Sequence, residues 1–296
     1  MKTEPVQNAS DNAATLPLRR PLRRPSLMDI SFFLCLLLYV FFIAGIIVAS
    51  LLLVAGTPLG RQRFLESIRD KYVLDAVWLS VWTSSVAAVI ALVISVPAGY
   101  VLSRYRFPGR QLLDSLVDIP IVLPPLLFGI ALLVLFQRTF VGPAFLAVGL
   151  KMVHEPAGIV LVQVLIAAAY GTRMLKGAFD GFDPRLPAVA QTLGCSRARA
   201  FFTVTLPTVR NDVVAAFVMI WARALALYGP IIAFVGSTAG YTEVMPTRMF
   251  LEMSVGRLEA ALAVALMMIA MAAVVLLIVK LAGGPSGDET ARMTRV

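Results

Sequence analysis

Residues 188–207 read AVAQTLGCSRARAFFTVTLP, a polar and basic segment between two long apolar runs. Gly194 lies near its middle, and Leu206-Pro207 closes it. Glycine readily adopts the left-handed backbone that ends a helix, and proline lacks the amide hydrogen that a helix interior requires. The pattern predicts two short helices joined by a turn, outside the membrane that the flanking runs occupy.

The boundaries of both helices can be predicted from capping residues. Asp183 is suited to the N-cap and Pro184 to the first turn of a helix that runs to about Leu193. Ser196 can cap a second helix over residues 197–204. The Leu-Pro pair is expected to end that second helix before the next apolar run.

The composition places the whole chain in the membrane class. Of 296 residues, 59% are hydrophobic, and the mean hydropathy is +0.86. Soluble domains are only about 45–50% apolar. The net charge of +9 favours basic cytoplasmic loops rather than a nucleic-acid surface.

Six segments are long and apolar enough to cross a bilayer, which requires about 20 residues. The third contains DIPIVLPPLLFG, in which Pro120, Pro124 and Pro125 predict a broken helix with an irregular cytoplasmic half. Such a break is tolerated where protein or a wet cavity covers it, so this span is expected inside the bundle. The six predicted spans are 30–54, 76–102, 112–136, 157–175, 213–235 and 260–281.

The distribution of Lys and Arg sets the orientation. With both termini in the cytoplasm, the cytoplasmic segments hold 17 basic residues and the opposite side holds 8, as the positive-inside rule requires. The first run is longer than the 7–15-residue core of a signal peptide, which favours a retained span. The predicted organisation is a basic tail at 1–28, a six-span domain at 29–281 with a cytoplasmic loop at about 176–210, and a second tail at 282–296.

Motifs for catalysis and metal binding are missing from the sequence. It has no GxxxxGK[ST] phosphate loop, no HExxH and a single histidine, His154. Its two cysteines, Cys35 and Cys195, are expected to be free thiols because no CxxC pair exists. The chain is therefore expected to be no enzyme and to hold no metal or cofactor.

The opening segment resembles the EAA loop of ABC importer permeases. The matching pattern is Ala190-x-x-x-Gly194, nine residues, then Val204-x-Leu206-Pro207, although Ala188 stands where the family has glutamate. The resemblance implies an all-α, six-transmembrane-helix bundle of the type I importer permease class, with this loop as its coupling helices. The coupling residues that it implies are Ala188, Ala190, Gly194, Cys195, Ser196, Arg197, Arg199, Phe201, Val204, Leu206 and Pro207. Phe201 and Phe202 are both expected to be exposed there.

The resemblance also implies partners. A pair of ATP-binding subunits would dock on the coupling loop and bind the ATP and Mg. An extracytoplasmic solute-binding protein would deliver the substrate, and a second permease copy would complete the pathway in the bilayer. ATP-driven closure of the ATPases would then switch the pathway between inward and outward access. No nucleic-acid partner is expected.

The third span and WARALALYGPIIAFVGSTAGYTEVM resemble the corresponding parts of molybdate, tungstate and sulfate permeases. The resemblance implies a small oxyanion as the substrate, molybdate or tungstate first and sulfate next. Iron, thiamine and polyamine permeases share the fold and remain alternatives. An ion-coupled secondary carrier is a further alternative, but it normally carries acidic residues within its spans.

Several residues are candidates for the pathway. Arg223 lies within the fifth span, where an arginine is costly unless it is paired or faces a wet cavity. It either pairs with Asp114, Asp118 or Gln163, or lines the pathway for an anion. The remaining candidates are Asp118 and Pro124 near the third span, and Ser237, Thr238 and Tyr241, which form either an outer gate or a simple turn.

Overall fold

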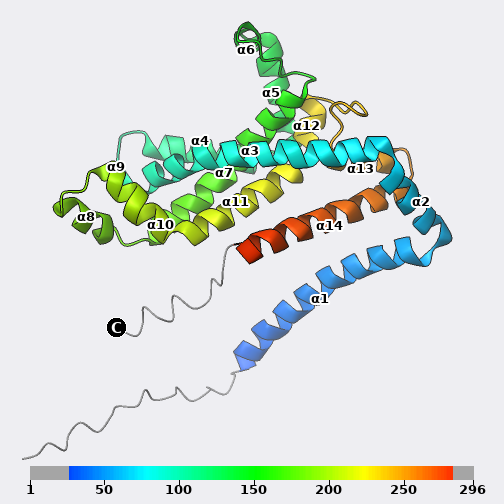
Figure 1. The fold of residues 1–296 in the computed structure, drawn as a ribbon, viewed down its shortest axis with the longest axis horizontal. Helices are drawn as coiled ribbons and strands as arrows, with labels where there is room; N and C mark the ends of the chain where they lie inside the picture. Colours follow the sequence, from blue (N-terminus) through cyan, green and yellow to red (C-terminus); the bar gives the residue numbers. More distant parts are fainter. Residues whose placement is uncertain (1–26, 283–296) are drawn as a thin grey trace, which may run out of the picture. The chain divides into compact units, whose positions relative to one another are not determined.

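The computed structural model describes residues 27–282, and every regular element in that range is a helix (Figure 1). Short loops join most of them. The helices are α1 (Leu27–Gly56), α2 (Pro58–Arg69), α3 (Lys71–Arg104), α4 (Arg110–Val122), α5 (Pro125–Arg138), α6 (Val141–Ala147), α7 (Pro156–Gly181), α8 (Arg185–Thr192), α9 (Arg197–Ala200), a π-helical turn (Phe201–Thr205), α10 (Leu206–Thr208), α11 (Arg210–Leu225), α12 (Gly229–Phe234), α13 (Met245–Ser254) and α14 (Leu258–Ala282).

The chain divides into two compact units, residues 1–49 and 50–296, and α1 begins in the first and ends in the second. Helix α1 is 30 residues long and agrees with the first predicted span. Its described side chains are almost all exposed. A helix that is apolar on every side is suited to lipid. Most of the predicted basic tail, residues 1–26, and most of the C-terminal tail, residues 283–296, lie outside the described residues.

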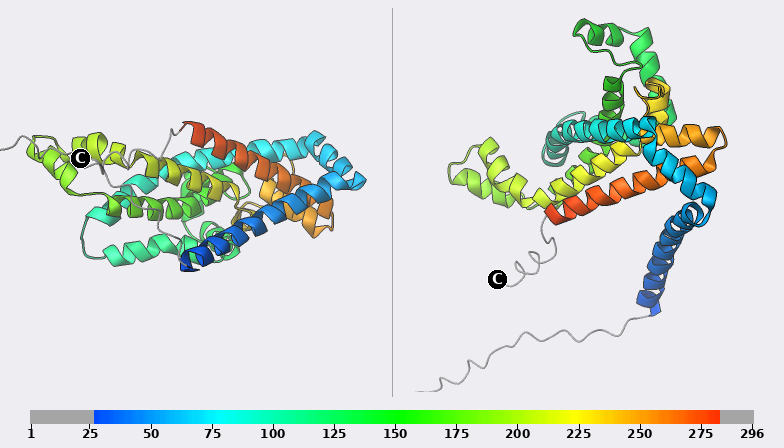
Figure 2. Two further views of the ribbon diagram at one scale, coloured as in Figure 1. Left: turned by 90° about the horizontal axis from the view of Figure 1, so that it is seen from below. Right: turned by 45° about the vertical axis from the view of Figure 1, so that its right-hand side comes forward.

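The core of the second unit is made by α3, α7 and α11, which lie side by side in Figures 1 and 2. Small side chains line their contacts, and Ala87, Ala91 and Ala167 are completely buried there. A Cβ on Gly171 would lie 2.4 Å from Cδ1 of Ile220. Small residues allow the close backbone approach on which helix association in lipid depends, because lipid removes the hydrophobic driving force between helices.

A charged cluster around Arg248 joins α13 to the junction of α2 and α3. Its guanidinium forms ion pairs with Glu252 at 2.9 Å, Glu243 at 3.2 Å and Asp70 at 3.4 Å. Burial raises the pKa of the Glu243 carboxyl above its ordinary value, although the charge of Arg248 acts in the opposite direction. The cluster fixes the segment between α12 and α13 against the start of α3.

Six predicted spans correspond to four long helices and two bent pairs. Within the described residues, 31–52, 71–104, 156–181 and 258–278 can each cross a membrane as one helix. Helices α4 and α5 meet the length and hydropathy requirement only together, and so do residues 197–208 with α11. The structure thus agrees with up to six crossings.

The break predicted in the third span is confirmed, because helices α4 and α5 meet at 111° and the break lies at Leu123-Pro124. The predicted irregular cytoplasmic half is wrong, because α4 is a regular helix through Pro120. Two consecutive prolines remove two amide donors, and this explains why the helix ends at the second proline site and not at the first. No side chain of α4 is buried within the described part of this chain.

The fifth predicted span, 213–235, is also broken. Helix α11 ends at Leu225, and α12 begins only at Gly229. Pro230 supplies the reason, because it has no N–H to donate to the carbonyl of Ala226 and its ring clashes with that carbonyl, whereas it is well suited to the first turn of a new helix. Figures 1 and 2 show that the short α12 then packs beside α5.

Candidate functional site

The loop between α7 and α11 contains the two predicted short helices and their turn. Gly194 has a φ of +91°. Its N–H donates to the carbonyl of Gln191 at 3.0 Å, and Cys195 N–H donates to Ala190 O at 3.1 Å. These two bonds define a Schellman C-cap. The left-handed turn predicted at Gly194 is therefore confirmed.

The predicted caps on both sides of that turn are confirmed as well. Oδ1 of Asp183 accepts from Arg185 N–H at 2.9 Å at the start of α8. Oγ of Ser196 accepts from Arg199 N–H at 3.3 Å and caps α9. Each cap satisfies an amide that has no partner within its helix.

The prediction that Leu206-Pro207 ends the second helix is wrong. Helical structure continues from α9 through a π-helical turn to Thr208, and the chain bends by 75° only before α11. In the π turn, Leu206 N–H bonds to Phe201 O, five residues earlier. This wider turn accommodates the proline ring, so the proline marks a bend rather than a stop.

An exposed apolar surface follows α8 and reaches the π turn. The exposed fractions are 81% for Leu193, 65% for Phe202, 57% for Val189 and 48% for Leu186. We call these four residues the docking patch. Arg197 and Arg199 are exposed nearby on α9. Apolar surface of this kind with basic neighbours is typical of a protein interface.

Phe201, in contrast, was wrongly predicted to be exposed. Its ring lies edge-on to Tyr100, with 4.8 Å between centroids, and also contacts Phe179. Phe201 therefore fixes the loop to α3 and α7 instead of presenting a surface. The other predicted coupling residues are distributed over the two helices: Ala188 is exposed on α8, Ala190 and Cys195 are half-buried at the turn, and Val204 and Leu206 are half-buried beside exposed Pro207.

Arg104, which the motif search missed, attaches the same loop to the core. One of its Nη atoms donates to Phe179 O and Phe182 O, each at 2.6 Å. Its guanidinium also lies 5.6 Å from the centre of the Phe182 ring. The available signal was a basic residue directly after the apolar run at 76–102, since such residues bond free carbonyls at helix ends.

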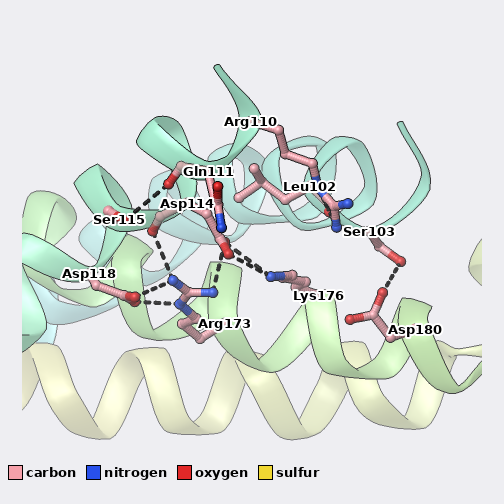
Figure 3. Close-up of polar contacts among 10 residues, drawn as sticks. All are labelled: Leu102, Ser103, Arg110, Gln111, Asp114, Ser115, Asp118, Arg173, Lys176 and Asp180. Atoms are coloured by element: carbon pink, nitrogen blue, oxygen red, sulfur yellow. Dashed lines mark hydrogen bonds and ion pairs between the residues drawn. The ribbon is translucent and has the colours of Figure 1, made fainter. Parts of the chain in front are cut away.

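A second cluster, shown in Figure 3, joins α4 to α7. Arg173 donates to Asp114 at 2.7 Å and also to Asp118, and Lys176 lies 2.9 Å from Asp114. Asp118 is thus the partner of Arg173 and not of Arg223. The cluster holds the charged side of α4 against α7, and beside it Ser103 donates to Asp180 at 2.6 Å.

Arg223 has none of the partners that the sequence suggested. Its guanidinium lies 4.7 Å from the centre of the Tyr170 ring, and its Nε is buried without a hydrogen-bond partner in the described chain. Gln163 instead donates to Ala224 O at 3.1 Å. A cation–π contact contributes about 0.5–2 kcal/mol, and a position in the last turn of α11 typically adds about 0.3–1 kcal/mol. A cation at the centre of a membrane helix costs about 2.5–3.5 kcal/mol or more, so at typical values these contacts offset only part of the cost of Arg223.

The candidate outer residues form an ordered turn. Ser237 donates to Oγ1 of Thr247 at 3.2 Å, and the carbonyl of Thr238 accepts three backbone amides. The hydroxyl of Tyr241 donates to Glu155, which raises the pKa of Tyr241 above its ordinary value. Ser237 and Thr238 therefore maintain the turn. Pro124 is exposed at the break between α4 and α5.

No group of three or more His, Cys, Asp or Glu residues that could hold a metal ion occurs between residues 27 and 282. Cys35 and Cys195 are free thiols in the same range, as predicted.

An all-helical membrane bundle with a two-helix loop capped in this way defines a transport permease. The chain matches the family model of the binding-protein-dependent transport system inner membrane component over residues 95–283. It therefore belongs to that family and is a permease component of an ABC importer.

Relatives and solved structures agree with this assignment. The chain is 34% identical over 250 residues to the molybdenum transport system permease protein ModB of Mycobacterium tuberculosis, covering 84% of this chain and 94% of the relative. It is 33% identical to the molybdate/tungstate transport system permease protein WtpB of Thermococcus kodakarensis, covering 69% and 78%. A bacterial ABC transporter involved in the import of alginate has a similar fold, with a TM-score of 0.69, 15% identity, and coverage of 86% and 93%.

Proposed function

We propose that this chain forms the translocation pathway of an ATP-driven importer for a small oxyanion, molybdate or tungstate first and sulfate next. The relatives with this substrate in their names match most of the chain at 33–34% identity. Their similarity to this chain supports the substrate class, and the coupling loop supports the proposal that ATP hydrolysis drives transport.

The docking patch is the observation that carries the coupling mechanism. Four large apolar side chains are exposed on a polar loop that has no lipid-spanning length of its own. A separate ATPase pair, which binds the ATP and Mg, would cover this patch in a groove. The rigid attachment of the loop through Phe201 and Arg104 would then pass the movement of the ATPase to α3 and α7.

The remaining partners follow from the orientation. With 17 basic residues on one side and 8 on the other, both termini and the coupling loop lie in the cytoplasm. A solute-binding protein would then dock on the opposite face, and a second copy of the chain would complete the pathway in the inner membrane.

Coupling can be tested with Leu193→Ser together with Phe202→Ser. We expect the double variant to insert normally and to lose the ATPase subunit on purification, because half of the docking patch is removed. Val255→Ser is the matched control, since Val255 is also 62% exposed but lies on the opposite side. Retention of the ATPase by the double variant at the wild-type level would contradict the role of the patch.

The substrate can be tested with the complete transporter in liposomes. The permease, its ATPase and its binding protein are reconstituted, and uptake of labelled molybdate is measured with competing tungstate, sulfate, ferric iron, thiamine or spermidine. We expect ATP-dependent uptake in which only the oxyanions compete. Uptake of a cation in place of molybdate would refute the substrate class.

A further inference from the structure

The two broken spans of the chain meet in space. One break is Leu123-Pro124, between α4 and α5, and the other is 226–228, between α11 and α12. A Cβ on Gly229 would lie 3.5 Å from the backbone nitrogen of Leu126, and a Cβ on Gly129 would lie 2.6 Å from Cα of Pro230. The starts of α5 and α12 therefore lie against each other. We call the two breaks together the double break.

The backbone at the first break is polar, and its side chains are exposed. Pro124 and Pro125 have no N–H, so the carbonyls of Pro120 and Ile121 lack their helical donors. Leu123 and Pro124 are exposed in the chain. Lipid does not tolerate such backbone, which occurs at membrane depth only where protein or water covers it. The double break is therefore suited to a wet pathway.

Arg223 lies at this position. It is in the last turn of α11, directly before the second break, about 20 Å along the helix from Arg210 at 1.5 Å per residue. Its ring partner Tyr170 packs in the same cluster as Leu227, which lies within the second break, and Phe128, which follows the first break in α5.

No carboxylate among residues 27–282 forms an ion pair with Arg223. Asp114 and Asp118, the acidic groups expected to pair with it, are both bonded to Arg173. Nε of Arg223 is buried and lacks a hydrogen-bond partner among the residues described. An unneutralised arginine at a wet break in a membrane helix marks a site for an anion.

We propose that Arg223, held over Tyr170 at the double break, is the side chain that contacts the oxyanion as it crosses the membrane. The proposal rests on the function proposed above. A tetrahedral oxyanion accepts hydrogen bonds through its oxygens, and a guanidinium offers up to five donors in a planar fork. The Tyr170 ring orients the guanidinium without neutralising its positive charge.

Uptake and ATP hydrolysis are compared for Arg223→Gln, Arg223→Lys and Arg138→Gln in the reconstituted transporter. We expect Arg223→Gln to reduce molybdate uptake tenfold or more. Its ATPase rate with loaded binding protein should stay within twofold of the wild type, because the coupling loop is unchanged. Arg223→Lys should be intermediate, since it keeps the charge and loses the fork. Arg138→Gln, which removes an exposed arginine, should transport normally.

The outcomes separate the two proposals. Wild-type uptake by Arg223→Gln overturns the role of Arg223 and leaves the oxyanion function standing. A parallel loss of uptake and ATPase rate also overturns it, because the residue would then act on coupling or folding. Absence of oxyanion uptake by the wild type overturns both proposals.

Labelling gives a second measurement that does not depend on transport. Cys35 and Cys195 are replaced by Ser, and Arg223→Cys is treated with a membrane-impermeant anionic thiol reagent. Ala224→Cys serves as the control, because Ala224 is fully buried. We expect modification at position 223 only, slowed by molybdate. Failure to modify position 223 with or without ATP would overturn the proposal.

Discussion

Gly194→Asp tests the coupling loop with a substitution that should reduce the stability of the chain itself only slightly. A Cβ at Gly194 would meet no atom within 4 Å, and the φ of +91° is the sole source of strain. A left-handed backbone costs a non-glycine residue about 1–2 kcal/mol, and aspartate is near the lower end. A loss of about 1 kcal/mol lowers the melting temperature of a domain of this size by about 2–4 °C.

The effect on the ATPase partner should be much larger. The new carboxylate would stand between Leu193 and Ser196, at the edge of the docking patch. Burying it in an interface without a partner costs at least as much as an unsatisfied polar group, about 1–3 kcal/mol. We therefore expect affinity for the ATPase to fall roughly tenfold or more, since 1.4 kcal/mol corresponds to a factor of ten, and uptake to be lost.

A matched control separates strain from docking. Gly256 has a φ of +78°, open space around its Cβ position and the same pair of capping bonds, Gly256 N–H to Met253 O at 3.1 Å and Arg257 N–H to Glu252 O at 2.9 Å. Gly256→Asp should lower the melting temperature equally and leave ATPase binding intact. The measurements are differential scanning fluorimetry and binding of the isolated ATPase to the permease in nanodiscs. Full ATPase binding by Gly194→Asp would refute the reasoning.

Three further predictions concern the packing of the bundle. Arg173→Gln should lower the free energy of unfolding of the permease by about 1–2 kcal/mol, because the partners of Arg173 are only partly buried. A double-mutant cycle with Asp118→Asn, measured by thermal unfolding, should show that the two losses are not additive. Burial raises the pKa of Glu243 above 4.5. Its contribution to stability is therefore complete below that pH and is lost as the pH rises through the pKa of the folded state. In melting curves between pH 4 and 8, the melting temperature of Glu243→Gln should rise relative to that of the wild type as the pH increases. Gly129→Ala should cost about 1–3 kcal/mol by forcing α5 from the backbone of α12, whereas Gly177→Ala, with open space, should be neutral or slightly stabilising by the same assay.

The local rules of helix capping were sufficient to predict the coupling loop. Asp183, Gly194 and Ser196 all have the roles that their residue types indicate, because caps depend on neighbours within four residues. The docking patch on α8 was readable too, from the spacing of Leu186, Val189 and Leu193 along one helical side. The family motif does not contain these residues, because its positions are largely the small ones that shape the turn.

The break in the fifth span was not predicted, because hydropathy does not report it. Residues 213–235 are apolar apart from Arg223 and a few weakly polar side chains, and a sliding window averages over Pro230. Pro207 shows the opposite error, since the helix passes through it by a π turn. A proline always removes one backbone N–H donor, but the surrounding packing decides whether the helix bends, widens or ends.

The partner of Arg223 could not be deduced from the sequence for a different reason. Asp114 and Asp118 were reasonable candidates, but Arg173 lies on the side of α7 that faces α4 and bonds to both. Ion pairing depends on which helix faces are adjacent, and that is a property of the folded bundle. In the part of the chain that the structure describes, Arg223 is therefore a membrane arginine without a carboxylate partner.

Helix α7 connects these features. Tyr170 lies under Arg223, and Arg173, three residues later and on the same side of the helix, holds α4. The end of the same helix is bonded through Phe179 to Arg104 and packed against Phe201 of the coupling loop. Because α7 is one unbroken helix of 26 residues, we infer that a displacement of the loop moves Tyr170 and the α4 anchor together. The angle between α4 and α5 and the position of the ring beneath Arg223 would then change in the same step, which is how movement at the ATPase would reach the double break.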